Sequence, residues 1–141
     1  MDIIRLCALG YALLLGFVIL TGYIPTFIDQ NDMIFGLFRR TWYADGLHFV
    51  SAMWALISAF ASRRASEMFF KLFGVFYFAD GMLGLVTGSG YLDFGIFING
   101  VLNLPLATRI FANLPHLGLG GLAILIGYVL TPMTRSQPAH A

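Results

Sequence analysis

Three ionisable side chains lie inside strongly apolar stretches of this sequence, and they are the groups with which it could do chemistry. His48, His116 and Asp80 each fall within a run of apolar residues long enough to cross a bilayer. Ionisable groups in such runs are costly to bury, so they usually face the interior of a helix bundle or a partner there. Two imidazoles and a carboxylate at one level predict a hydrogen-bonded cluster, a metal site or a haem site with two axial histidines.

Several roles compete for the two histidines. A b-type haem would need His48 and His116 to point into one slot between their segments. A chlorophyll or bacteriochlorophyll needs one axial histidine with small neighbours, and Ala44 and Ala112 each lie four residues before a histidine. Zinc would need further ligands in a tetrahedral array, which Asp80 and Asp45 could supply, but the single cysteine lies in another segment. Zinc is therefore the least favoured of the three cofactors, and we assign no metal ligands. The structural alternative is that both histidines bind carbonyl groups left unpaired at helix ends.

Asp45 and Asn113 precede the two histidines by three residues each. At this spacing they add two polar groups inside the membrane on the same face as the histidines. The structural alternative is that both are N-caps, which predicts that the second and fourth helices begin there. At 1.5 Å per residue, each histidine would lie about 5 Å below its helix end and Asp80 about 10 Å below. We therefore expect all three groups at one depth, in the outer half of the bilayer.

Four apolar segments must position these groups. They cover residues 3–24, 43–61, 68–86 and 110–130, and about 20 apolar residues of helix cross a hydrocarbon core of about 30 Å. The composition agrees, with 59% hydrophobic and 11% charged residues. The sequence predicts an all-α membrane protein, a four-transmembrane-helix bundle that forms a single membrane domain over residues 1–141.

The two halves of the chain, residues 1–62 and 66–131, share a pattern of glycines, aromatic residues and a histidine. This predicts two parallel-repeat helical hairpins related by an axis along the membrane normal. In each copy, small residues follow the histidine at i+4, i+7 and i+11. They are Ala52, Ala55 and Ala59 in one half and Gly120, Ala123 and Gly127 in the other. Because small residues let membrane helices approach closely, we expect the second and fourth helices to meet through them at the bundle centre.

Charge and motifs narrow the function. Arg5, Arg63, Arg64 and Arg135 fall on one side of the predicted bundle, so the positive-inside rule places both termini in the cytoplasm, with the chain in the bacterial inner membrane. A net charge of +1 gives no reason to expect nucleic acid. The sequence has no P-loop, Rossmann glycine run or nucleophile elbow, which argues against an enzyme.

The chain resembles an uncharacterised bacterial family, a domain of unknown function, of small four-helix integral membrane proteins. The resemblance rests on Leu47-His48, on Pro115-His116-Leu117-Gly118, on the Gly10, Gly16 and Gly22 pattern, and on Phe73-Gly74-Val75-Phe76-Tyr77. It implies a histidine early in spans two and four, and no established activity. Members often carry a second histidine one turn away, which this chain lacks, and that difference argues against a multi-ligand metal site.

Small size and missing enzyme motifs favour a non-catalytic accessory or structural subunit of a larger respiratory or photosynthetic membrane complex. Its expected partners are the lipid bilayer and other integral membrane subunits. The first alternative is a protein that binds haem or a chlorophyll-type pigment through His48 and His116. The second alternative is a small transporter or redox enzyme that uses Asp80.

Overall fold

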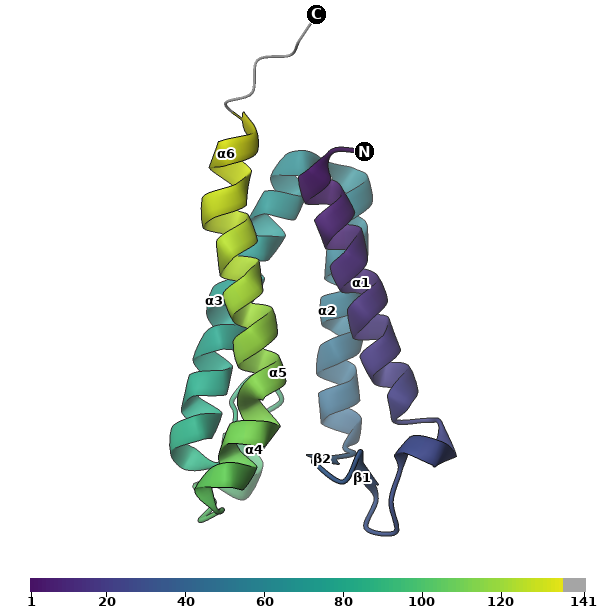
Figure 1. Ribbon diagram of the computed structural model, residues 1–141, viewed down its shortest axis with the longest axis vertical. Coiled ribbons are helices and arrows are strands. Elements are labelled where there is room, and N and C mark those ends of the chain that lie inside the picture. Colours follow the sequence, from purple (N-terminus) through teal and green to yellow (C-terminus); the bar gives the residue numbers. More distant parts are fainter. Residues whose placement is uncertain (136–141) are drawn as a thin grey trace, which may run out of the picture.

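The computed structural model describes residues 1–135 of the chain. In chain order its elements are α1 (Ile3–Thr21), the 3-10 turn η1 (Pro25–Phe27), β1 (Met33–Ile34), β2 (Phe38–Arg39), α2 (Trp42–Ala61), α3 (Arg63–Thr87), α4 (Gly95–Asn99), α5 (Leu106–Leu125), the π-helical turn η2 (Ile126–Leu130) and α6 (Thr131–Arg135). Four helices in the described part are long and apolar enough to cross a membrane, the fourth being the continuous helix Leu106–Arg135. The all-α prediction is confirmed, and Figure 1 shows the long helices running nearly parallel.

Short polar side chains begin three of the helices. The Asp2 carboxylate accepts the backbone N–H of Ile4 at 3.0 Å and starts α1. Thr41 and Ser62 cap α2 and α3 in the same way, each through its hydroxyl oxygen. Such caps satisfy backbone donors that have no partner within the helix.

The second and fourth long helices begin earlier than predicted. Asp45 and Asn113 were expected as their N-caps, but α2 begins after Thr41 and α5 begins after Pro105. Both predicted caps therefore lie inside helices, and Pro115 lies inside α5 as well. In apolar surroundings every backbone N–H and C=O needs an internal partner. A helix therefore continues toward its N-terminus beyond a residue that could have capped it.

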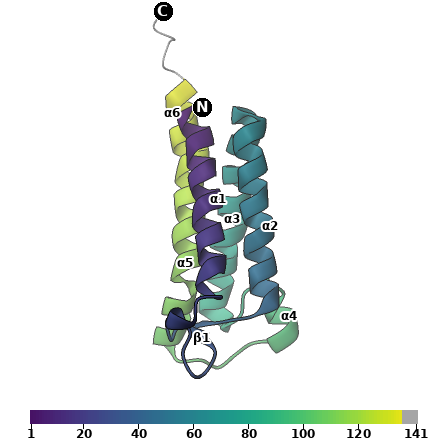
Figure 2. The same cartoon turned by 90° about the vertical axis from the view of Figure 1, so that its right-hand side faces the viewer.

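The helices pack as two hairpins. The largest interfaces are those of α3 with α5 and of α1 with α2, while α3 also touches α1 and α2. Helix α3 is the most deeply buried of the four long helices. Figure 2 shows these helices side by side, with α4 and the β1–β2 hairpin at one end of them. The two hairpins are therefore joined mainly through α3.

The prediction that the second and fourth helices meet through their small residues is wrong, because α5 packs on α3. A Cβ atom on Gly120 would lie 2.8 Å from the Cα of Phe78, and one on Gly127 would lie 3.0 Å from the backbone nitrogen of Lys71. Ala123 lies beside Gly74 of α3 in the same interface. The small residues of α2 (Ala52, Ala55 and Ala59) are buried, with α1 as the main neighbour of their helix. Helix α3 brings its own glycines to the contact, so the α3–α5 pair approaches most closely.

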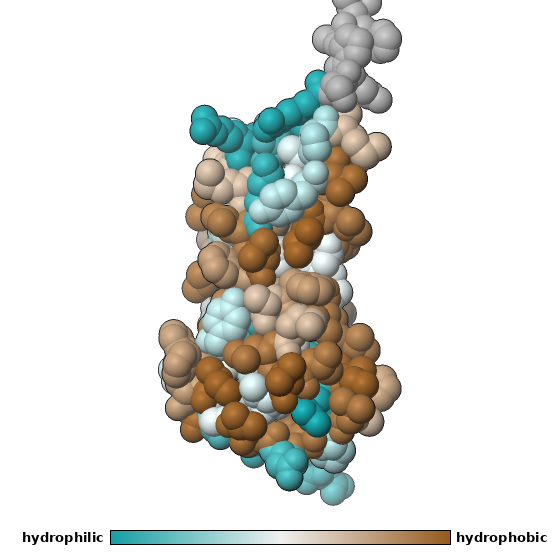
Figure 3. All heavy atoms as spheres, turned by 90° about the vertical axis from the view of Figure 1, so that its left-hand side faces the viewer, coloured by the Kyte–Doolittle hydropathy of each residue, from teal (hydrophilic) through white to brown (hydrophobic). Residues whose placement is uncertain are grey.

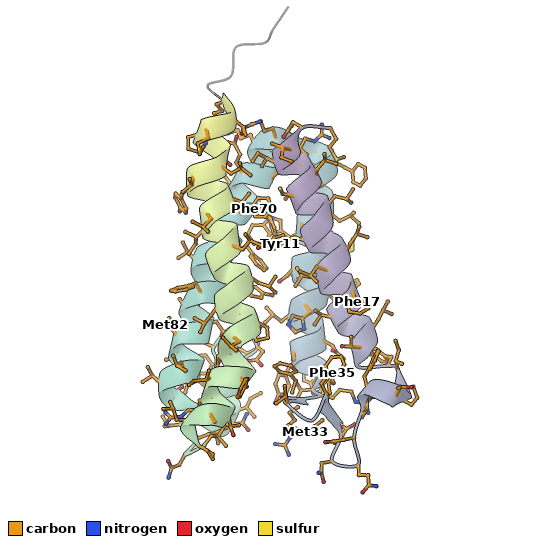
Figure 4. All side chains as sticks on the ribbon, viewed as in Figure 1. Tyr11, Phe17, Met33, Phe35, Phe70 and Met82 are labelled. Atoms are coloured by element: carbon orange, nitrogen blue, oxygen red, sulfur yellow. The ribbon has the colours of Figure 1, made fainter. Side chains whose placement is uncertain are left out.

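An aromatic cluster fills the space between the hairpins. The Tyr11 ring of α1 stands edge-on to Phe70 and Phe73 of α3, with centroid distances of 5.1 Å and 5.6 Å. Its hydroxyl donates a 2.8 Å hydrogen bond to the carbonyl oxygen of Leu119 in α5. Figure 4 shows Tyr11 and Phe70 facing one another across the centre of the molecule. One tyrosine therefore ties α1 to both helices of the second hairpin.

Candidate functional site

The structure brings His48, His116 and Asp80 together from three different helices. His116 of α5 bonds through Nδ1 to the Oδ2 atom of Asp80 in α3. The ring of His48, in α2, lies 6.0 Å from the ring of His116 between centroids, and the two planes are inclined at 84°. These three residues, with Ser51 and Tyr77, form what we call the histidine–aspartate cluster.

Asp80 is fixed on both oxygens. Its side chain is 3% exposed, and its Oδ1 atom accepts the backbone N–H groups of Tyr91 and Leu92 at 2.7 Å and 2.9 Å. The loop after α3 must fold back to reach it, and Gly90 makes this possible, since a Cβ there would lie 2.5 Å from Oδ1. Burial, together with the Asp80 carboxylate, raises the pKa of the Tyr91 phenol. Asp80 is therefore an anchored acceptor that orients the His116 ring.

The bond to Asp80 sets the chemistry of His116. When the imidazole is neutral and its Nδ1–H donates to the carboxylate, Nε2 keeps a free lone pair. The His48 ring makes no hydrogen bond within residues 1–135, and its one ring contact there is with His116. The cluster therefore presents one oriented imidazole and one unengaged imidazole at short range.

Two members of the cluster, Ser51 and Tyr77, were not predicted as site residues from the sequence. The Ser51 and Tyr77 hydroxyls share a buried 2.6 Å hydrogen bond, which links α2 to α3. The Tyr77 ring lies 5.0 Å from that of His116. A sequence signal was present, because Ser51 follows His48 by three residues and Tyr77 precedes Asp80 by three. Residues at this spacing share one face of a helix.

Asp45 and Asn113 lie outside the cluster. The Asp45 carboxylate accepts a 3.2 Å hydrogen bond from the Tyr23 hydroxyl near the loop end of the molecule. The Asn113 amide donates to the carbonyl of Arg109 at 2.8 Å and packs against Gly84 of α3. Both side chains bind local partners instead of extending the cluster.

Within residues 1–135, no group of three or more histidine, cysteine, aspartate or glutamate side chains is placed to hold a metal ion. Asp80 is already engaged by three donors. The cluster therefore holds two imidazoles and one carboxylate that orients one of them.

Comparison with protein-family models, with curated proteins and with solved structures returned no match. The arguments that follow therefore rest on the residues and their geometry.

Proposed function

We propose that the chain is a multi-pass protein of the bacterial inner membrane that binds one b-type haem between His48 and His116. The observation that carries this proposal is the 6.0 Å separation of the two imidazole rings. Metal–nitrogen bonds to histidine are about 2 Å long, so two imidazoles this close could hold one metal ion together. The ligands come from different hairpins, so a haem there would also join the two halves of the molecule.

The Asp80 contact supports a role for His116 as a residue that would hold the haem. Histidines that ligate metals almost always donate their other ring N–H to a carboxylate or carbonyl, which fixes the tautomer and the ring orientation. A bis-histidine haem also uses both imidazoles, whereas a chlorophyll-type pigment needs one. The same contacts argue against a transporter or redox enzyme built on Asp80, because its two oxygens are already occupied by hydrogen bonds.

Small residues next to the two histidines leave space for a flat macrocycle on one side only. Ala44 and Ala52 flank His48 one turn away on either side, and Ala112 lies one turn before His116. Gly120, one turn after His116, offers no such space because α3 packs directly against it. His48 and His116 would hold the haem, and the alanines beside them would leave room for its ring.

Membrane placement rests on the surface of the long helices. Large apolar side chains on their outer faces are widely exposed, for example Leu13 at 68%, Phe49 at 59% and Val86 at 69%. On the face drawn in Figure 3, apolar residues cover the middle of the molecule and hydrophilic residues gather toward its two ends. We place the end that holds Met1 and Arg135 in the cytoplasm by the positive-inside rule. The pairing of α1 with α2 and of α3 with α5 supports the proposed parallel repeat.

We also propose that the protein works as an accessory subunit of a larger membrane complex. A bound haem supplies one-electron chemistry. With one histidine pair in the outer half of the bilayer, the chain by itself cannot carry an electron across the membrane. Another integral membrane subunit would have to complete the path, as in respiratory or photosynthetic complexes.

An absorption spectrum tests the haem directly. The protein is produced in haem-replete cells, extracted in mild detergent and assayed for haem content and for the spectrum of a six-coordinate iron. We expect about one haem per chain, and the variants H48A and H116A should each lose the haem or turn it five-coordinate. N113A is the matched control, because Asn113 lies on the same helix as His116 but outside the cluster, and its spectrum should not change. Wild-type protein that folds without bound haem would refute the proposal.

The composition of the gently extracted complex tests the accessory role. We expect other integral membrane proteins to co-purify with the chain in stoichiometric amounts. A stable lone monomer, recovered in full from the native membrane, would contradict this role.

A further inference from the structure

A cationic groove lies at the end of the molecule that holds Met1 and Arg135. It runs between α3 and the helix that continues from α5 through η2 into α6, and its volume is about 660 Å3. Four cations line it, namely Arg63, Arg64, Lys71 and Arg135, against the single carboxylate of Glu67. Figure 3 shows hydrophilic residues extending from this end down the flank of the molecule. The groove therefore carries an excess of positive charge.

Two of these cations have structural partners. Glu67 is buried, and its carboxylate pairs with Arg63 at 2.9 Å and with Arg135. Arg63 also donates to the carbonyl of Thr131 and to the hydroxyl of Thr134, at 3.1 Å and 2.7 Å. These contacts hold the start of α3 against α6, so they account for Arg63 and Arg135 without a ligand.

Among the described residues, the other two cations have no anionic partner. Arg64 is exposed and forms no ion pair within residues 1–135. The Lys71 ammonium lies 5.4 Å from the centroid of the Tyr128 ring, a cation–π contact that leaves its charge uncompensated. Arg64 and Lys71 are seven residues apart on α3, which is about 10 Å along the helix. The groove thus begins at the polar end of the helix and descends along its apolar flank.

The walls between the two cations are apolar. Met68 and Leu72 line the same groove and are 53% and 42% exposed. A small free anion would bind to the cations, but it would gain no binding energy from Met68 and Leu72. A molecule with an anionic head and a hydrocarbon chain matches both features.

We propose that this groove binds an anionic phospholipid of the cytoplasmic leaflet. The phosphodiester lies between Arg64 and Lys71, and the first part of an acyl chain lies along Met68 and Leu72. Basic pockets between transmembrane helices on the cytoplasmic side are suited to anionic headgroups, and charge-assisted hydrogen bonds to phosphate are strong. This site is separate from the histidine–aspartate cluster and does not depend on haem.

Native mass spectrometry of the detergent-solubilised protein tests the proposal by lipid titration. Phosphatidylglycerol and phosphatidylcholine with identical acyl chains are the two probes, and phosphatidylglycerol should bind more tightly. Since each basic residue near an anionic lipid surface contributes about fivefold in affinity, R64Q and K71Q should each weaken phosphatidylglycerol binding about fivefold, and together about 25-fold. R39Q is the matched control, because it removes one exposed charge from β2 at the opposite end and should leave binding unchanged.

Two results would overturn the proposal. One is equal affinity of the wild-type protein for the two lipids, a comparison that needs no variant to fold. The other is displacement of phosphatidylglycerol by inorganic phosphate at similar concentration, which would identify a site for a free anion. Thermal unfolding in phosphatidylcholine bilayers should be the same for R64Q and wild-type protein, so that weaker binding reports the site and not the fold.

Discussion

Replacing Gly120 with alanine should force α5 away from α3 and destabilise the second hairpin. The new Cβ would lie 2.8 Å from the Cα of Phe78 and 3.0 Å from the carbonyl oxygen of Gly74, and ordinary contact begins at 3.4 Å. Both obstacles are backbone atoms, so no side-chain rotation relieves them and the helices must separate by more than half an ångström. A gap of that size removes roughly a quarter to a half of the dispersion energy of each affected contact.

The expected magnitude follows from two opposing effects. Overpacking of this kind costs about 1–3 kcal/mol, while alanine gains up to about 1 kcal/mol over glycine from helix propensity. Gly118 provides the matched control on the same helix, because a Cβ there would meet nothing within 4 Å. G118A should therefore be neutral or slightly stabilising, and G120A should be less stable than G118A by about 2 kcal/mol.

Equilibrium unfolding in mixed detergent micelles, followed by helical circular dichroism, measures this difference. A shift of α5 should also weaken the contact between His116 and Asp80, so G120A should bind less haem if the proposed site is right. Equal stability of G120A and G118A would refute the close α3–α5 packing on which the position of His116 depends.

Three further predictions concern contacts within the described residues. E67Q should lose about 2 kcal/mol of unfolding free energy in the same micelle assay, because Glu67 is buried against two arginines; wild-type stability would contradict this. Y77F should lose about 1 kcal/mol of unfolding free energy, because it leaves the Ser51 hydroxyl unpaired. Removing that hydroxyl as well, in the Y77F/S51A double variant, should cost no further stability. If the losses of the two single variants simply add in the double variant, the shared hydrogen bond is refuted. G88A should cost at least about 1 kcal/mol more than G36A, because both glycines have positive φ, but a Cβ on Gly88 would also strike the carbonyl oxygen of Leu102 whereas one on Gly36 would meet nothing closer than 3.9 Å. Thermal melts showing equal losses would disprove that steric contact.

The long helices could be predicted from the sequence because their signal is local. A run of about 20 apolar residues fixes a helix wherever the backbone cannot bond to water, whatever packs against it. The same reasoning singled out His48, His116 and Asp80, since an ionisable group in an apolar run stands out by itself. Helix starts were less certain, because Thr41 and Asp45 are both competent caps and sequence does not rank them.

Only the tertiary structure decided which helices meet. The small residues Gly120, Ala123 and Gly127 indicate that α5 is approached closely, but they would serve any partner equally well, and the glycines of α3 settled the choice. That pairing placed Asp80 against His116 and Ser51 against Tyr77, contacts between residues 36 and 26 positions apart. The local sequence pattern therefore determined the helices and the candidate side chains. The fit of one helix surface to another determined the cluster, because complementarity is a property of two surfaces and neither sequence segment contains it alone.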